Sequence, residues 1–307
     1  MNKILVTGGA GFIGSHLTEF LSKKNRVLVI DNLSQGNKIE NLNKNIKLVK
    51  GDVRDEKLIS HYSKECSTIY HLAAILGVDV VSEKNVETME CEYESIKNIC
   101  YAAKKNNIKK IIYTSSSGVY GKINYRSSVK ENSIIAPISA YAVAKRSAEI
   151  YLKNFYLEQK SKIDCIVFRL FNIYGPRQDQ RMVIPRFINQ ALKNKSLTVY
   201  GKGDHTRDFT HIDDCIKIFD LINKKKIKGF HILNIARGHQ LNINSLAKKI
   251  IKKIGSQSKI LHIPVPKTLE EFQVKRRCGN CSNLFKLIKF KPKTNLEEGL
   301  NNLIYSN

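Results

Sequence analysis

Two side chains four residues apart, Tyr141 and Lys145, have an evident chemistry. They lie in a stretch from about 140 to 159 whose apolar residues recur at helical spacing, and positions four apart share one face of a helix. An ammonium beside a phenol favours the phenolate and so lowers the pKa of the tyrosine. Such a tyrosine can act as a base toward an alcohol near neutral pH. The alternative is a buried tyrosine that happens to precede an exposed lysine.

A serine-rich segment adds further hydroxyl groups. It runs from Tyr113 to Gly121, at the carboxyl end of a strand predicted over 110–115. Ligands bind at this edge of open α/β sheets. A serine hydroxyl there can hydrogen-bond the alcohol that the tyrosine would deprotonate. The alternative is a turn whose serines cap the next segment.

The elements that must position these groups begin at the start of the chain. An apolar run over 4–6 leads into a glycine-rich turn over 7–14, and residues 15–24 show helical spacing. This order lets backbone N–H groups approach a pyrophosphate, and the helix N-terminus adds partial positive charge. A second strand ends at Asp31, whose carboxylate can accept hydrogen bonds from ribose hydroxyls and repel a 2′-phosphate. The pattern predicts a dinucleotide site that favours NAD over NADP; an ordinary turn with an incidental aspartate is the alternative.

Strands and helices alternate through the first half of the chain. This alternation predicts an α/β protein with a doubly wound parallel sheet, the Rossmann fold. After Asn172 prolines become frequent and the elements shorten. We therefore expect residues 1–172 to form the NAD-binding domain and residues 173–307 a smaller mixed α/β substrate domain. The chain is expected to return to the first domain at about 210–236, where a helix start and a strand are predicted.

Composition excludes several classes of protein. No apolar run is long enough to span a bilayer, and the first is too short for a signal peptide, so we expect a cytoplasmic protein without a membrane partner. Seven scattered cysteines suit reduced thiols, and the lone pair Cys278 and Cys281 cannot complete a zinc site, so no metal is expected. The net charge of +25 comes mostly from lysines. They lack the stripe interleaved with aromatics that is typical of nucleic-acid binding, so no nucleic-acid partner is expected.

The motifs together resemble those of a known family. They are TGGAGFIG at 7–14, Asp31, GDV at 51–53, HLAA at 71–74, the serine-rich strand end, Tyr141 with Lys145, RLFNIYGPR at 169–177, VYGKGDHTRDF at 199–209 and the segment 290–300. The chain resembles the extended short-chain dehydrogenase/reductases of the NAD-dependent epimerase/dehydratase family, in the style of the UDP-glucose 4-epimerases. The likeness covers nearly the whole chain.

The resemblance implies roles for individual residues. It implies a NAD site formed by Gly8, Gly11, Phe12, Ile13, Gly14, Asp31, Asp52, Val53, Leu72, Ala73, Ala74, Tyr141 and Lys145. It implies that Ser116 touches the sugar, and that Asn172, Tyr200, Arg207 and Arg276 (or its neighbour Arg277) bind the nucleotide part of a nucleotide-diphosphate sugar. Tyr141 would then take the proton of the sugar C4 hydroxyl while hydride passes from C4 to NAD.

The reaction that follows oxidation depends on two positions. The family's 4,6-dehydratases carry an Asp-Glu pair directly after the position of Ser116, and its decarboxylases usually carry a glutamate at the position of Gly118. Ser117 and Gly118 supply no such acid. The implied enzyme is therefore a 4-epimerase. A net 4-dehydrogenase that releases a 4-keto sugar, for example from a GDP-heptose, and a non-catalytic NAD-binding protein are the alternatives.

One stretch departs from the family. Where an Asn-x-x-Gly-Thr motif usually opens a helix near residue 92, this chain has ECEYES at 90–95. The preceding loop, 75–88, is expected to border the sugar, so its changes weaken the case for UDP-glucose or UDP-galactose as substrate. The apolar stripes over 92–106 and 140–159 exceed what one sheet face needs, so they predict a homodimer through a four-helix contact.

Overall fold

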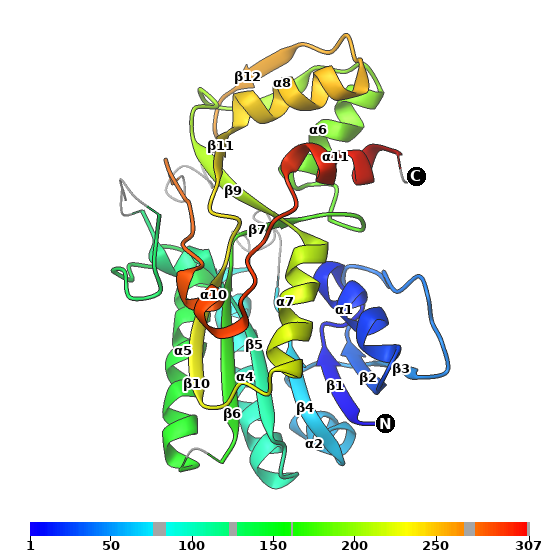
Figure 1. Cartoon of the computed structure of the whole chain (residues 1–307), viewed down its shortest axis with the longest axis vertical. Helices are drawn as coiled ribbons and strands as arrows, with labels where there is room; N and C mark the ends of the chain where they lie inside the picture. Colours follow the sequence, from blue (N-terminus) through cyan, green and yellow to red (C-terminus); the bar gives the residue numbers. More distant parts are fainter. Residues whose placement is uncertain (76–83, 123–127, 161, 267–273, 306–307) are drawn as a thin grey trace.

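Seven parallel strands form the central sheet of the computed structural model, in the order β10-β6-β5-β4-β1-β2-β3 (Figure 1). They are β1 (Lys3–Thr7), β2 (Arg26–Asp31), β3 (Ile46–Lys50), β4 (Cys66–His71), β5 (Lys110–Ser116), β6 (Asp164–Leu170) and β10 (Phe230–Ile235). The structure describes residues 1–75, 84–122, 128–160, 162–266 and 274–305. Strand order reverses beside β1, so a crevice opens at the carboxyl ends of β1 and β4. The predicted Rossmann fold is confirmed.

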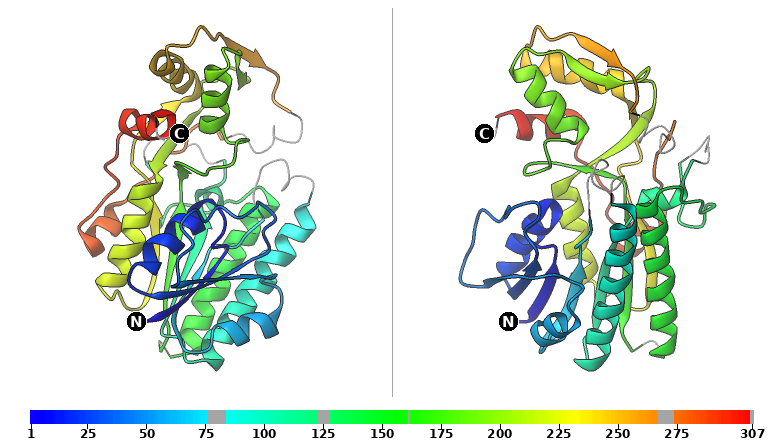
Figure 2. Two further views of the ribbon diagram at one scale, coloured as in Figure 1. Left: turned by 90° about the vertical axis from the view of Figure 1, so that its right-hand side faces the viewer. Right: turned by 180° about the vertical axis from the view of Figure 1, so that it is seen from behind.

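Helices cover both faces of this sheet (Figures 1 and 2). One face carries α1 (Phe12–Ser22) and α7 (Ile212–Lys224), and the other carries α2 (Glu56–Tyr62), α4 (Asn85–Lys105) and α5 (Ala140–Glu158). Successive side chains of a strand point to opposite faces, so Ile4 and Val6 pack in the first layer and Leu5 in the second. Both faces are buried, and several strands accordingly contain a continuous apolar run, such as ILV in β1, VLVI in β2 and CIVF in β6.

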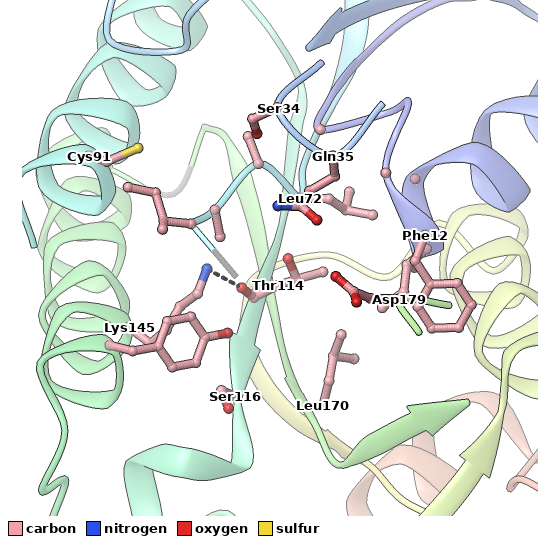
Figure 3. Close-up of a pocket in the computed structure, with 18 of the residues that line it drawn as sticks. Phe12, Ser34, Gln35, Leu72, Cys91, Thr114, Ser116, Lys145, Leu170 and Asp179 are labelled. Carbon is pink, nitrogen blue, oxygen red and sulfur yellow. Dashed lines mark hydrogen bonds between the residues drawn. The ribbon is translucent and has the colours of Figure 1, made fainter. Parts of the chain in front are cut away.

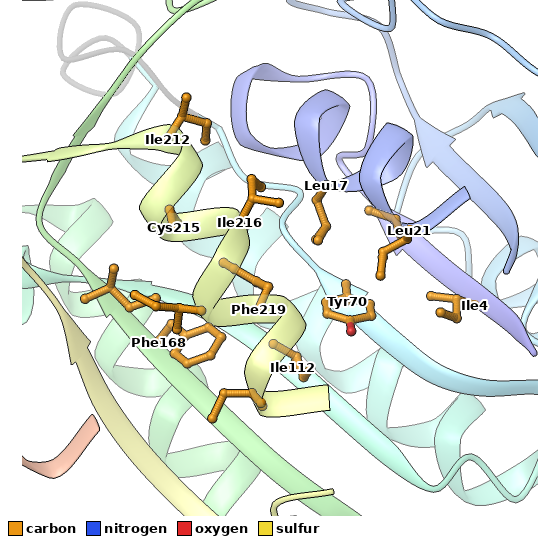
Figure 4. Packing of buried hydrophobic residues seen from close by; sticks show 14 of the residues in the cluster. Ile4, Leu17, Leu21, Tyr70, Ile112, Phe168, Ile212, Cys215, Ile216 and Phe219 are labelled. Atoms are coloured by element: carbon orange, nitrogen blue, oxygen red, sulfur yellow. The ribbon is translucent and has the colours of Figure 1, made fainter. Parts of the chain in front are cut away.

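The first of these layers consists of buried apolar and aromatic side chains packed together (Figure 4). Leu17 of α1 and Phe219 of α7 lie over Tyr70 of β4 and Phe168 of β6, and all four side chains are fully buried. The rings of Phe168 and Phe219 meet edge to face with centroids 4.7 Å apart. Complete burial of one such side chain stabilises the fold by about 1.5–3 kcal/mol.

A smaller lobe stands above the crevice with a separate core. Its elements are β7 (Asn172–Tyr174), α6 (Val183–Leu192), β8 (Leu197–Tyr200), β9 (Thr206–His211), β11 (Gln240–Asn242), α8 (Ile243–Ile254), β12 (Ile260–Ile263) and α11 (Leu296–Tyr305). They form a mixed sheet β11-β9-β7 and a parallel pair β12-β8. Phe187, Leu197, Leu246 and Leu300 are completely buried between them.

The chain crosses between the lobes several times. Helix α7 and strand β10, both within 210–236, belong to the larger lobe. Helix α10 (Ser282–Ile288) also packs against β10 and α7, although we expected it in the smaller domain. Its Leu284 and Ile288 are buried in the core of the larger lobe, which is the physical reason for the difference. Among the described helices, none is long and apolar enough to cross a membrane.

Candidate active site

A cavity of about 520 Å³ lies in the crevice between the lobes (Figure 3). Most of the predicted site residues line it: Gly8, Gly11, Phe12, Ile13, Gly14, Asp31, Asp52, Val53, Leu72, Ala73, Ala74, Ser116, Tyr141, Lys145 and Asn172. In the close-up, Lys145 and Ser116 lie on one side of the cavity, and Phe12 and Asp179 lie on the other. The predicted constellation is therefore brought together in space, although its members come from segments between residues 8 and 172.

The glycine turn is built for a close backbone approach. Gly8 has φ +68°, a conformation that side chains rarely adopt. A Cβ on Gly14 would lie 2.0 Å from the Gly8 carbonyl oxygen, so only glycine fits there. Helix α1 begins after Gly11 without a side-chain cap, so its first-turn N–H groups are available to a ligand. These features fit the pyrophosphate of a dinucleotide.

Two carboxylates lie at one end of the cavity. Both oxygens of Asp31 accept backbone hydrogen bonds, from Ala10 N at 2.9 Å and Leu33 N at 2.8 Å, which fixes the carboxylate at the end of β2. Asp52 is held by Arg54, whose Nη2 lies 2.6 Å from Oδ2, and this hydrogen bond holds the pKa of Asp52 below its ordinary value. Asp31 thus lies at the end of β2 on the cavity wall, a position that fits its predicted role of binding the cofactor ribose.

Tyr141 and Lys145 enter the cavity from the first turns of α5. Ser139 caps this helix by accepting the Ala142 N–H at 3.1 Å, so the chain begins to coil just before Tyr141. The Lys145 ammonium lies 5.7 Å from the centroid of the Tyr141 ring. Ser116, at the end of β5, hydrogen-bonds Tyr141. A hydroxyl, a phenol and an ammonium thus converge where the sequence analysis predicted them.

The pKa of Tyr141 differs from the one that we expected from the sequence. Burial raises the pKa of Tyr141, and Lys145 and the Ser116 hydrogen bond only partly oppose this increase. The net result is a pKa above the ordinary value, whereas we predicted a lowered one. One reason is that burial desolvates the phenolate. The other is the negative charge of the Glu92 carboxylate, which the prediction did not include.

Glu92 is the residue that sequence reasoning missed. Its carboxylate lies 3.0 Å from the Lys145 ammonium and also accepts the Tyr113 hydroxyl, and both side chains of the ion pair are nearly inaccessible to solvent. A signal was present in the sequence. Glu92 precedes Ile96 and Ile99 by four and seven positions, so it shares the buried face of α4 with them.

The predicted substrate residues are only partly brought together. Tyr200 and Arg207 are not among the residues that line the cavity. Arg276 is exposed and is not among the residues that line the cavity, whereas its neighbour Arg277 is, so we propose Arg277 rather than Arg276 for the substrate site. The backbone of this segment is irregular and bends at Lys275, so two neighbouring side chains can differ in whether they reach the cavity.

Arg207 and Arg277 form a cationic pair in the described part of the chain. Arg207 Nη1 donates to Val274 O at 2.7 Å, and Arg277 Nη2 donates to Gly121 O at 3.1 Å. Burial lowers the pKa of each to about 10, and for Arg277 the charge of Arg207 adds to the decrease. Neither guanidinium has a carboxylate partner among the described ion pairs, so an anionic group would satisfy both.

The fold and this site together define a class, the NAD-dependent short-chain dehydrogenase/reductases with a second lobe. Residues 4–236 match the family described as NAD dependent epimerase/dehydratase. The chain is 34% identical to a UDP-N-acetyl-alpha-D-glucosaminuronate decarboxylase of Bacillus cytotoxicus, over 98% of this chain and 96% of the relative. It is also 34% identical to a putative UDP-glucose 4-epimerase of Methanocaldococcus jannaschii, over 98% and 97%.

A solved structure shows the same architecture. The UDP-glucose 4-epimerase of Thermotoga maritima superimposes with a TM-score of 0.92 and 30% identity, over 99% of this chain and 97% of that one. The chain belongs to the NAD-dependent epimerase/dehydratase family. It is therefore an enzyme of this family, and its cofactor is NAD, as the glycine turn and Asp31 predicted.

Proposed function

We propose that the protein is a nucleotide-sugar 4-epimerase that oxidises C4 of its substrate reversibly. The observation that carries this proposal is the convergence of Ser116, Tyr141 and Lys145 beside a dinucleotide site, without an acid at the two positions that follow Ser116. The similarity to a UDP-glucose 4-epimerase supports it. The base and the sugar of the substrate are left to experiment.

The residues act on the sugar alcohol as follows. Bound NAD supplies a hydride acceptor at C4. The Tyr141 phenolate accepts the proton of the C4 hydroxyl, so the C4–O bond becomes a carbonyl as the C4–H bond gives up its hydride. Ser116 hydrogen-bonds the same oxygen, and Lys145 binds the cofactor ribose. When the 4-keto sugar turns over, Tyr141 returns its proton to the same oxygen, and C4 would take back its hydride on the opposite face.

The absence of an acid after Ser116 separates this reaction from elimination. Ser117 and Gly118 begin the short 3-10 helix η1 (Ser117–Tyr120), and neither carries a carboxyl group that could exchange a proton at C5 or C6. A glutamate at Gly118 would also be crowded, because its Cβ would lie 3.3 Å from Ser116 Oγ and 3.4 Å from the Ala142 Cβ. The similarity to a decarboxylase therefore supports the fold of this chain but not a decarboxylation reaction.

Arg207 and Arg277 support a diphosphate substrate. Arg277 lines the cavity, and Arg207 lies near enough for its charge to lower the pKa of Arg277; neither has a carboxylate partner among the described ion pairs, so an anion beside them would relieve their repulsion. Asn172 lines the same cavity and is fixed by its donation to Asp208 O at 3.1 Å. We propose that these three residues hold the diphosphate.

The test uses the purified protein with UDP-, GDP-, CDP- and dTDP-sugars, with NMR to identify products. Epimerisation should return the cofactor to its oxidised form in each cycle. A stoichiometric increase in reduced-cofactor absorbance with a 4-keto product would instead support the net 4-dehydrogenase. Tyr141→Phe should reduce turnover by about 10²–10⁴-fold without loss of NAD binding. Tyr62→Phe, a tyrosine on the distant helix α2, is the matched control.

We further propose that the protein is a homodimer through α4 and α5. These helices lie side by side, and Figure 2 shows them together in the view from behind. Val143, Ile150 and Leu157 recur every seven residues on α5 and are exposed, as are Tyr93 and Tyr101 on α4. Ile150→Lys should give a monomer by light scattering, whereas Leu261→Lys, an equally exposed leucine of the smaller lobe, should not. A monomeric wild type would refute the proposal.

A further inference from the structure

We infer that Glu92 is a positioning residue that draws the Lys145 ammonium away from Tyr141, so that the catalytic tyrosine ionises at a higher pH than it would otherwise. This inference rests on the proposed role of Tyr141 as base. Glu92 itself touches neither the sugar nor the cofactor in this scheme. It acts through Lys145, and it sets the pH at which the enzyme begins to work.

The geometry of the ammonium carries the inference. A lysine has three N–H donors. One from Lys145 goes to Glu92 Oε1 at 3.0 Å and one to Thr114 O at 3.0 Å, which leaves one for Tyr141 or a ribose hydroxyl (Figure 3 shows the contact with Thr114). Lys145 therefore has only one N–H group left to donate toward the Tyr141 hydroxyl. Its side chain is fixed before any ligand binds.

Burial makes the Glu92 charge effective. The side chains of Glu92 and Lys145 are 3% and 2% exposed, so water screens their pair poorly. The Tyr113 hydroxyl donates to the same Oε1 and packs its ring 4.9 Å from the Lys145 ammonium. A carboxylate so placed neutralises the cation that would otherwise stabilise the Tyr141 phenolate.

Other titratable groups around the pair do not change charge in the working range. Burial lowers the pKa of His71, on β4, to about 3, and raises that of Cys91, on α4, to about 11. Burial, and then Glu92, raise the pKa of Tyr113, on β5, well above its ordinary value. On α5, the Glu149 carboxylate is paired with Arg169 at 2.7 Å. The ionisation of Tyr141 therefore depends chiefly on Glu92 and Lys145.

The experiment compares wild type with Glu92→Gln, which keeps an acceptor for Lys145 and Tyr113 but removes the charge. Tyrosinate absorbance, with Tyr141→Phe as the blank, is measured for the NAD-loaded protein without substrate. At one alkaline pH, Glu92→Gln should show more Tyr141 phenolate than wild type. Equal or smaller ionisation would overturn the inference. Because no sugar is present, this result is independent of the proposed 4-epimerase reaction.

Turnover gives the second readout. With an identified nucleotide sugar, the acidic limb of the kcat/KM profile, where activity rises as Tyr141 ionises, should move to lower pH by about one unit in Glu92→Gln, the usual effect of one neighbouring charge. A lower plateau with an unmoved limb would show a merely structural role and contradict the inference. If no sugar turns over, the proposed function fails while the spectroscopic result stands.

Controls separate charge from packing. Tyr113→Phe removes the shared hydroxyl but keeps the carboxylate, so it should not increase Tyr141 ionisation. Glu94→Gln removes an exposed carboxylate two residues along α4 and should change nothing. If Glu92→Gln is unfolded by circular dichroism, Glu92→Asn, a smaller neutral amide, should show the same increase in phenolate.

Discussion

Arg177 Nη1 lies 2.9 Å from Glu19 Oε1, and this ion pair joins the loop after β7 to helix α1. Both side chains are largely buried, and Glu19 also accepts the Glu40 backbone N–H at 2.8 Å. The loop that follows Arg177 contributes Gln178 and Asp179 to the cavity wall. One carboxylate thus fixes the dinucleotide-binding helix relative to the loop that covers the cavity.

Glu19→Gln should weaken NAD binding without affecting the glycine turn itself. Loss of a partly buried ion pair costs about 1 kcal/mol, which corresponds to a roughly fivefold larger dissociation constant. Isothermal titration calorimetry measures this change. Glu65→Gln removes an exposed carboxylate paired with Lys3 and should bind NAD like the wild type. Equal affinities in all three proteins would show that the ion pair does not organise the loop.

Asp31→Asn should narrow the preference for NAD over NADP. The substitution removes a charge that repels a 2′-phosphate, while the amide oxygen can still accept one of the two backbone N–H groups. We expect the ratio of the two dissociation constants to change by about tenfold, or about 1.4 kcal/mol. Asp55→Asn, at the N-cap of α2, tests for a general effect of lost charge. An unchanged ratio of the NAD and NADP dissociation constants would contradict the placement of Asp31 at the cofactor ribose.

Arg277→Gln should raise the KM for a nucleotide sugar, because a charge-assisted hydrogen bond to the diphosphate is lost. Such a bond contributes about 1.5–3 kcal/mol, which predicts an increase of about 10–100-fold. Arg276→Gln changes the adjacent, exposed arginine and should leave the KM nearly unchanged. Steady-state kinetics of the two variants provide a matched comparison. A larger increase in KM for Arg276→Gln than for Arg277→Gln would instead indicate that Arg276 binds the substrate.

His71 should make the protein less stable in acid. It is completely buried between Thr7 Oγ1 at 2.7 Å and Ser95 Oγ at 3.1 Å, and burial lowers its pKa from 6.5 to about 3. Between these values the unfolded chain binds a proton that the native protein does not, so the free energy of unfolding rises with pH. The slope is about 1.4 kcal/mol per unit for this one proton.

Urea denaturation at several pH values between 3 and 6.5 measures this slope. The contribution of His71 is complete above 6.5 and decreases as the pH falls toward 3. His71→Asn is expected to be less stable at neutral pH because it loses packing, but its stability should depend less on pH. An equally steep dependence in His71→Asn would assign the acid sensitivity to other groups.

Much of the fold and the site could be predicted from the sequence, because local pattern and chemistry coincide there. The glycine turn, Asp31 and the Tyr141/Lys145 pair each follow a strand or lie on a helix whose periodicity is clear. The choice between Arg276 and Arg277 could not be made, because which of two neighbours faces the cavity depends on the path of an irregular segment.

Glu92 illustrates a different limit. Helical spacing places it on the buried face of α4, yet spacing gives no information about its partner, which comes from α5, 53 residues along the chain. The raised pKa of Tyr141 follows from this contact and from burial, and neither can be obtained from a motif. The loop at 75–88, expected to border the sugar, lies largely outside the described residues.

The interleaved path of the chain has a consequence for how the enzyme can be divided. Helix α7 covers Tyr70, Ile112 and Phe168, and it is synthesised only after much of the smaller lobe. A fragment that ends at residue 172 would expose this apolar surface and lack the edge strand β10. No single chain break therefore separates the two lobes. During synthesis, the larger lobe can complete its fold only after the first elements of the smaller lobe have been made.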